Sequence, residues 1–456
     1  MTLITPTDKP TGALIGSART ALRPPPRPGI AEKWFVFIAM CTYAMNLPTD
    51  WFVVSTLEET AGNESTGPLA SIVFLAFAGI AFLIVLPRFE VIIHIARRAV
   101  FLGLLACWLV LTTVWSADPP TTLRRSFGVF LTVFFAFYLV ARFERPELLR
   151  LAAYASAATV WINLAFVFGL PSFAVNPQTG ILDGTTWNRN SLGQLVVLCA
   201  LQLVLYAAMK PTSRIWIVPT IGAALFLLLG TESKTSLASA VLLSGLLVIF
   251  QLFRARKTLF GAVAFSMGGA SVIAIMFATA NLPAITDILD RDITLSGRTK
   301  LWDELLPVIG HHPILGQGYS AFWRGWFSPA HDIWLADNWF PPSAHNATLD
   351  YLLELGIIGL GLVLAYFFTA VVWATYDIRD NPGAAGTWPL AMLAYQLMFS
   401  VTESGVIARN FAFLLLSVLV ASVSISRAET LGRTAARHRD AEREQAAVTK
   451  SGDPTT

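Results

Sequence analysis

Long apolar runs recur along most of this chain, and they restrict its fold more than any other feature. Each run has about 16–25 residues, the length that crosses a bilayer as an α-helix. Only 13% of the 456 residues are charged and 55% are apolar, whereas a soluble domain carries about 25% charged residues. A soluble protein of this size could not cover its apolar surface with so few charges. We therefore expect an all-α, polytopic integral membrane protein.

The runs predict about twelve transmembrane helices between two polar tails. The tails, residues 1–33 and 427–456, are expected to be cytoplasmic, the first of them disordered. Residues 34–426 then form one transmembrane domain. The predicted spans are 34–54, 69–87, 99–115, 126–141, 151–170, 192–209, 215–230, 236–253, 258–280, 349–375, 387–402 and 407–426.

The distribution of Lys and Arg predicts the orientation of these spans. With the N-terminus inside and the spans alternating, 23 of the 32 positive side chains fall on the inside. Both termini are therefore predicted to be cytoplasmic, and residues 281–348 become a long external loop, a kind of loop that is usually functional. The small net charge of +3, spread over short clusters, argues against a nucleic-acid partner.

Arg298 is a candidate site residue because it lies where this loop turns helical. Apolar residues at positions 301, 302, 305, 306 and 309 have helical spacing, so a helix is expected to start near Ser296 or Thr299. A helix N-terminus offers unbonded N–H groups and a positive dipole end, which suit phosphate. The guanidinium adds a forked, permanently charged donor. The alternative is an arginine that anchors the helix to lipid headgroups.

His345 lies at the other end of the loop, directly before Asn346, a good N-cap for the next membrane helix. Such a histidine can be neutral near pH 7 and accept a proton, or it can simply bond the loop backbone. Lys234 and Arg189 lie in shorter external loops. A cation at membrane depth is costly and is therefore a functional hypothesis, although Lys234 could instead pair with Glu232.

Other patterns carry weaker hypotheses. Arg409 is a further cation near a span end. Adjacent His311 and His312 point apart and would bind one metal poorly. The acid-x-acid triplet at 290–292 resembles a metal and nucleotide-sugar motif, yet nucleotide sugars are cytoplasmic and this triplet is predicted outside. The tryptophans of the loop suit either stacking on sugars or packing of the loop itself. The cysteines lie far apart in apolar runs, which favours small buried hydrophobes: Cys41, Cys107 and Cys199.

Several of these segments together resemble the O-antigen ligase and polysaccharide polymerase superfamily of bacterial inner-membrane proteins. In topology the resemblance covers most of the chain, but its specific motifs lie within 184–360. The turn 233–235 and the stretch 188–193 resemble further family segments. The main motifs are Gly297-Arg298-Thr299 with Trp302, His312-Pro313 with Gly316 and Gly318, and His345-Asn346 with Leu349, Leu352 and Gly356.

The resemblance implies a multi-pass glycosyltransferase of the inner membrane that acts on its periplasmic face and needs neither metal nor cofactor. Its donor would be a glycan on undecaprenyl diphosphate, and its acceptor a glycan or a lipid-linked acceptor. By position, Arg298 and Lys234 would hold the diphosphate, with Arg189 as a third candidate. His345 would deprotonate or orient the acceptor hydroxyl. Many members have Arg where Lys234 stands, and a chain-length regulator is a further partner that the resemblance implies.

Three functions follow from this reading. The first is a polymerase that joins lipid-linked repeat units into an exopolysaccharide or O-antigen, by inverting glycosyl transfer. The second is a ligase that moves a finished glycan onto lipid A core with the same donor chemistry. The third is a polysaccharide or lipid transporter, which would place ionisable residues near the bilayer midplane rather than at one face. We favour the polymerase, of the exopolysaccharide type.

Overall fold

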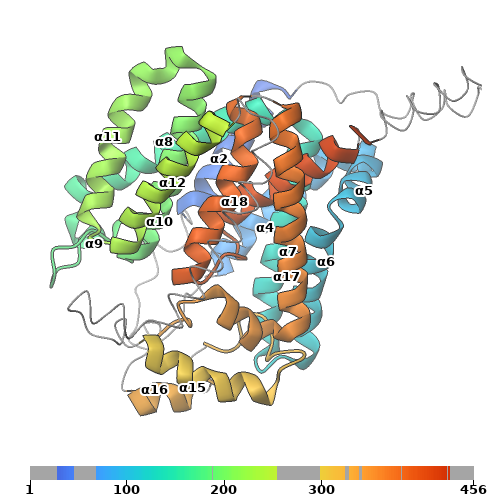
Figure 1. Ribbon diagram of the computed structural model, residues 1–456, viewed down its shortest axis with the longest axis vertical. Coiled ribbons are helices and arrows are strands. Elements are labelled where there is room, and N and C mark those ends of the chain that lie inside the picture. The colour runs from blue at the N-terminus through green and yellow to red at the C-terminus, as the bar shows by residue number, and fades with distance from the viewer. Residues whose placement is uncertain are drawn as a thin grey trace, which may run out of the picture.

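The computed structural model describes residues 28–45, 68–186, 188–253, 298–323, 328–337, 341–381, 383–428 and 430–431, and over these ranges the protein is a bundle of helices (Figure 1). Within them no β-strand forms, and Val175 and Leu182 make an isolated antiparallel bridge. The fold class predicted from the apolar runs, an all-helical multi-pass membrane protein, is confirmed at this level.

The longer helices follow one another in the order of the predicted spans. In chain order they are α2 (Ile30–Met45), α4 (Pro68–Val85), α5 (Phe89–Arg98), α6 (Val100–Leu111), α7 (Pro119–Arg142), α8 (Arg145–Gly169), α10 (Arg189–Met209), α11 (Arg214–Gly230), α12 (Lys234–Phe253), α15 (Arg298–His311), α17 (Ala347–Asp380), α18 (Ala384–Thr402) and a final helix, Phe411–Ala428. Short helices lie between them, including α9 (Pro171–Ala174) and α16 (His331–Asp337).

Every predicted span overlaps one of these helices except 258–280, which lies outside the described residues. Seven helices in the described part of the chain are long and apolar enough to cross a membrane. The number twelve and the inside-outside orientation therefore stay predictions. One boundary was wrong: α2 begins at Ile30, inside the predicted tail 1–33. The sequence hid this start because Glu32 and Lys33 look like solvated charges, yet both are held in ion pairs.

Large aliphatic and aromatic side chains cover the outside of the bundle. Among them, Leu83, Val218, Val241 and Phe368 are each at least 66% exposed. So much exposed apolar surface would drive a soluble protein to aggregate, but hydrocarbon is a good solvent for it. The polar ends of these helices lie at the two ends of the bundle, which agrees with a bilayer around its middle.

Ion pairs fasten one end of the bundle, the end predicted to be cytoplasmic. Glu32 on α2 accepts two hydrogen bonds of 2.7 Å from the guanidinium of Arg142 and one of 3.0 Å from the hydroxyl of Tyr138. At the same end, Arg145 forms an ion pair with Asp377 of α17 and donates to Ser422 of the final helix. These contacts join α2, α7, α8, α17 and the final helix.

The opposite end is covered by the segment that was predicted to be a long loop. There α15 and α16 lie across the ends of the bundle helices (Figure 1). They share a separate small core in which Trp323 is 4% exposed and Trp334 is fully buried. Of the two readings of the loop tryptophans, packing therefore holds for Trp323 and Trp334, whose faces are closed to a sugar.

Candidate functional site

The segment 313–318 (the 313–318 insert) enters a break in α17. The helix is interrupted at Gly356, whose φ is 64° and ψ is −170°. On one side of the break, the amides of Gln317 and Gly318 donate to the carbonyls of Leu353 and Glu354, each at 2.9 Å. On the other side, the amide of Ile357 donates to the carbonyl of Pro313 at 2.9 Å. The insert therefore satisfies backbone groups that hydrocarbon would leave unbonded.

This arrangement explains why the glycines of the motif occur together. A Cβ on Gly316 would lie 2.5 Å from the backbone nitrogen of Leu355, and one on Gly356 would lie 2.6 Å from that of Leu315. Gly318, with φ of 101°, packs against Ser116. These glycines allow two backbones to touch, and the contact fixes the segments on either side of the insert.

His345 faces Glu403 across the same end of the bundle. Its Nδ1 lies 3.3 Å from Oε2 of Glu403, and the side chains are 18% and 12% exposed. Its backbone is left-handed, with φ of 48°, and its amide donates to the hydroxyl of Ser343 at 3.3 Å. A proton on Nδ1 would donate to the carboxylate and make Nε2 the basic nitrogen of the ring.

The residues beside this pair are fixed by Asp350, one turn into α17. Its carboxylate accepts from the amide of Ala344 at 3.1 Å, from Nε1 of Trp323 at 2.8 Å and from the hydroxyl of Ser404. Ala344 precedes His345 and Ser404 follows Glu403. One buried carboxylate thus holds in place both chain segments of the site, the one before His345 and the one after Glu403.

Asn346 caps α17 as predicted. Its Oδ1 accepts from the amides of Thr348 at 3.0 Å and Leu349 at 3.2 Å. Asn188 does the same for α10 through the amides of Asn190 and Ser191. Both caps lie at the end of the bundle that carries the site, so the N-termini of these helices, and their positive dipole ends, face it.

Arg298 is the first residue of α15, as the spacing predicted. One turn later, Trp302 donates from Nε1 to the carbonyl of Ala344 at 2.8 Å. That carbonyl belongs to the residue before His345, so the start of α15 and the histidine are linked through a single hydrogen bond although 47 positions separate them in the sequence. The side chain of Arg298 itself lies outside the described part.

Arg189 and Lys234 lie at neighbouring helix N-termini. Each is the first residue of its helix, α10 and α12, and each is exposed. The hydroxyl of Ser233 donates to Oδ1 of Asn190 at 3.0 Å, which joins the two helix starts. Burial raises the pKa of Asp183 and nearby Arg189 opposes that rise. Among the described side chains, no ion pair links Lys234 to Glu232, so that alternative is not what this structure shows.

Contacts through α18 connect the two groups of residues. The hydroxyl of Tyr395 on α18 donates to the carbonyl of Gln194, in the second turn of α10, at 3.0 Å. Two turns after Tyr395, α18 ends and Glu403 follows. The candidate residues therefore lie at one end of the bundle, where a continuous series of hydrogen bonds and packed helices runs from Lys234 to His345.

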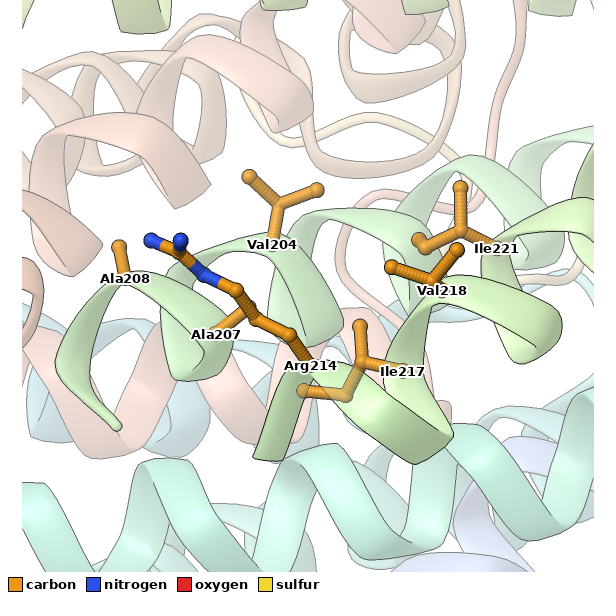
Figure 2. Close-up of a pocket in the computed structure, with 7 residues that line it drawn as sticks. All are labelled: Val204, Ala207, Ala208, Arg214, Ile217, Val218 and Ile221. Atoms are coloured by element: carbon orange, nitrogen blue, oxygen red, sulfur yellow. The ribbon is translucent and has the colours of Figure 1, made fainter. Parts of the chain in front are cut away.

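If Lys234, Arg298 and His345 act on one lipid diphosphate, they should converge around a shared outward-facing hollow, and this convergence stays a prediction. Two hollows are described, and both lie elsewhere. One, of about 500 Å³, is lined by Trp115 and the 313–318 insert. The other, of about 390 Å³, lies between α10 and α11 (Figure 2).

The candidates with weaker support in the sequence are exposed, outside the described residues or packed inside the bundle. His311 and His312 are exposed, and 290–292 lies outside the described residues. No cluster of three or more His, Cys, Asp or Glu side chains with metal-binding geometry occurs among the residues that the structure describes. Arg409 is half-buried, and its guanidinium lies 4.2 Å from the centre of the Phe74 ring, so it packs inside the bundle.

Asp350 and Glu403 were not among the predicted site residues. Glu403 directly follows a predicted span, and Asp350 lies four residues after a helix cap. Each is a carboxylate close to the membrane, which is a signal of function by itself. Their partners, however, are 54 and 58 positions away, so only the fold pairs them.

The fold and this site define an all-helical, multi-pass membrane protein that gathers a histidine, carboxylates and helix-terminal cations at one face. Residues 219–364 match the model of the family described as O-antigen ligase. The match covers both the Lys234 turn and the segment from α15 to the first half of α17.

Two proteins of known name are similar over most of the chain. The exopolysaccharide production protein ExoQ of Rhizobium meliloti is 26% identical over 312 residues, 65% of this chain and 70% of the relative. An O-antigen ligase of Pseudomonas aeruginosa is 26% identical over 367 residues, 78% of this chain and 84% of the relative. These matches confirm the resemblance to the O-antigen ligase and polysaccharide polymerase superfamily, and they indicate a membrane enzyme of glycan transfer.

Proposed function

We propose that this protein polymerises undecaprenyl-diphosphate-linked oligosaccharide repeat units into an exopolysaccharide or O-antigen at the periplasmic face of the inner membrane. The observation that carries the proposal is the contact between His345 and Glu403, held by Asp350 and joined through Ala344 to the start of α15. A base supported by a carboxylate, next to a helix start that carries an arginine, suits the transfer of a sugar from a diphosphate to a hydroxyl.

In the proposed reaction the acceptor hydroxyl attacks the anomeric carbon of the donor. The carbon–oxygen bond to the diphosphate breaks, and the configuration at that carbon inverts. Negative charge grows on the leaving diphosphate, and fixed cations stabilise that growth more than they stabilise the bound donor. Arg298, Lys234 and Arg189 supply these cations. As the resemblance implies, the step needs no metal.

His345 takes the proton of the acceptor hydroxyl. Glu403 keeps the ring oriented and stabilises the imidazolium that forms, because an anion 3.3 Å from Nδ1 favours the charged ring. General-base catalysis of this kind contributes about 10²–10⁴-fold. A lipid-linked donor suits this position, since its polyprenyl chain remains in the bilayer while its diphosphate lies among the helix N-termini.

An assay with purified protein and lipid-linked repeat units tests the proposal. Wild-type protein should give ladders of increasing length, and Arg298→Ala should give no product although the protein accumulates normally. Arg298→Lys should recover part of the activity, because lysine keeps the charge but lacks the fork. His345→Ala should lose most of the turnover while donor binding is retained. Full turnover by the His345 variant would remove the histidine from the mechanism.

The second candidate is a ligase that transfers the glycan to lipid A core. The similarity to a named O-antigen ligase over 78% of the chain favours it. If the glycan is transferred only to lipid A core and no ladders form, the polymerase proposal is wrong and the protein is a ligase. A transporter, the third hypothesis, would keep full glycan output in both Arg298→Ala and His345→Ala.

A further inference from the structure

A groove runs between α10 and α11 at the end of the bundle away from the candidate site. It holds about 390 Å³. Its walls are aliphatic: Val204 and Ala208 come from α10, and Val218 and Ile221 from α11 (Figure 2). Figure 2 shows these four side chains directed to the same open side, with the Arg214 side chain extending across the groove towards Ala208.

The groove opens towards the region that the bilayer occupies. Both helices are long and apolar enough to cross a membrane. Val204 is 45% exposed and Val218 is 67% exposed, so the rim of the groove is apolar surface on the outside of the bundle. Apart from Arg214, the side chains that line this cleft are aliphatic, and they suit a hydrocarbon chain.

Two cations lie at one end of the groove. Arg214 is the first residue of α11, and Lys210 lies four residues earlier, directly after α10. Both side chains are exposed, and neither forms an ion pair with an acid among the residues that the structure describes. The two cations flank the short turn between the helices, Pro211–Ser213.

Aromatic rings lie beside this turn, as expected at a membrane interface. Trp216 lies 5.6 Å from Tyr154 and 6.1 Å from Tyr206, measured between ring centres. Trp and Tyr collect where headgroups meet hydrocarbon. Along α11 the cation Arg214, the ring of Trp216 and the aliphatic side chains of Val218 and Ile221 thus follow one another in the order of phosphate, interface and acyl chain.

We propose that this groove binds one acyl chain of an anionic phospholipid whose phosphate rests between Arg214 and Lys210. Basic pockets between transmembrane helices recognise anionic headgroups in this way. The chain would lie along α10 and α11 as far as Ile221, about 10 Å from Arg214 at 1.5 Å per residue. The site is separate from the proposed catalytic residues, which lie at the opposite end of α10.

Native mass spectrometry of the full chain in detergent micelles tests this site. The probes are phosphatidylglycerol and phosphatidylcholine with identical acyl chains. Wild-type protein should retain one phosphatidylglycerol at concentrations where phosphatidylcholine has dissociated. Arg214→Ala should weaken that binding about fivefold, and Arg214→Ala with Lys210→Ala about 25-fold, at roughly 1 kcal/mol for each cation near the surface.

Two further variants separate a built site from a general attraction of charge. Arg97→Ala removes an exposed cation from α5, away from the groove, and should leave the binding unchanged. Ala208→Phe keeps both cations but fills the groove, and it should also weaken the binding. Equal retention of the two lipids by wild-type protein, an equal loss with Arg97→Ala, or a groove closed by a second copy of this chain would each overturn the proposal.

Discussion

Replacing Gly356 with alanine should strongly destabilise the protein, because the break in α17 needs a residue without a side chain. With φ of 64° and ψ of −170°, Gly356 occupies a region that is essentially reserved for glycine. An added Cβ would lie 2.6 Å from the backbone nitrogen of Leu315 and closer still to the carbonyl of Ile314. Backbone cannot rotate away as a side chain would, so the 313–318 insert must move.

The loss of folding stability can be estimated from these contacts. Forcing alanine into this conformation costs about 1–3 kcal/mol. Displacing the insert also strains the three backbone hydrogen bonds of 2.9 Å that span the break, each worth about 0.5–1.5 kcal/mol net. The sum, about 3–7 kcal/mol, is a large part of the 5–15 kcal/mol that typically stabilises a folded protein. We expect the apparent Tm of the detergent-solubilised protein to fall by about 5–15 °C.

Gly361→Ala is the matched control. Gly361 lies in the same helix, has no heavy atom within 4 Å of an added Cβ and has ordinary helical backbone. Alanine there should leave Tm unchanged or raise it slightly, because alanine favours helix over glycine by about 0.5–1 kcal/mol. Thermal unfolding followed by intrinsic tryptophan fluorescence compares the two variants. Equal Tm values for Gly356→Ala and Gly361→Ala would refute the view that the insert requires this glycine.

Three further predictions concern the site and the ion pairs. Glu403→Gln should lower the turnover number and leave the KM for the donor nearly unchanged, because the ring of His345 loses the carboxylate that faces its Nδ1 at 3.3 Å; a turnover number equal to that of wild-type protein would separate the two residues. Asn346→Ala should cost about 1 kcal/mol of stability and reduce turnover, because the backbone next to His345 becomes less fixed. Thermal unfolding and the ladder assay measure the two effects, and a loss of stability with normal turnover would mean that the cap is only structural. Arg142→Ala removes a bidentate partner from half-buried Glu32 and should lower the free energy of unfolding by about 1.5–3 kcal/mol. The folded fraction should keep normal turnover. A Tm equal to that of wild-type protein would mean that the apolar face of α2 holds the helix in place instead.

Several residues show how far local sequence could lead. Asn346 is recognisable as a cap because an Asx side chain before an apolar run bonds only nearby amides. Arg298 is recognisable as a helix start for the same local reason, and α15 does begin there. Glu32 and Lys33 misled the placement of the first helix, since their partners Arg142 and Glu147 come from other helices.

The motif glycines could be interpreted only in part from the sequence. Gly316, Gly318 and Gly356 were noticed as members of one resemblance, but nothing in their local sequence says that two of them face the same backbone contact. Trp323 and Trp334 are similar: composition allowed sugar stacking or packing, and burial decides for packing. The roles of Arg298, Lys234 and Arg189 in binding a diphosphate remain predictions, and the assays above address them.

By itself, the sequence determined that this chain is a helical membrane protein, because the length of an apolar run and the position of a helix cap depend on neighbours within the same segment. It also indicated the resemblance to the O-antigen ligase and polysaccharide polymerase superfamily, because the motifs that carry this resemblance are short and local. Only the tertiary structure decided that Glu403 meets His345, that Asp350 holds the residues beside both, and that the 313–318 insert completes a broken helix. Such pairings join segments many residues apart, and they arise when helices pack so that every buried polar group finds a partner.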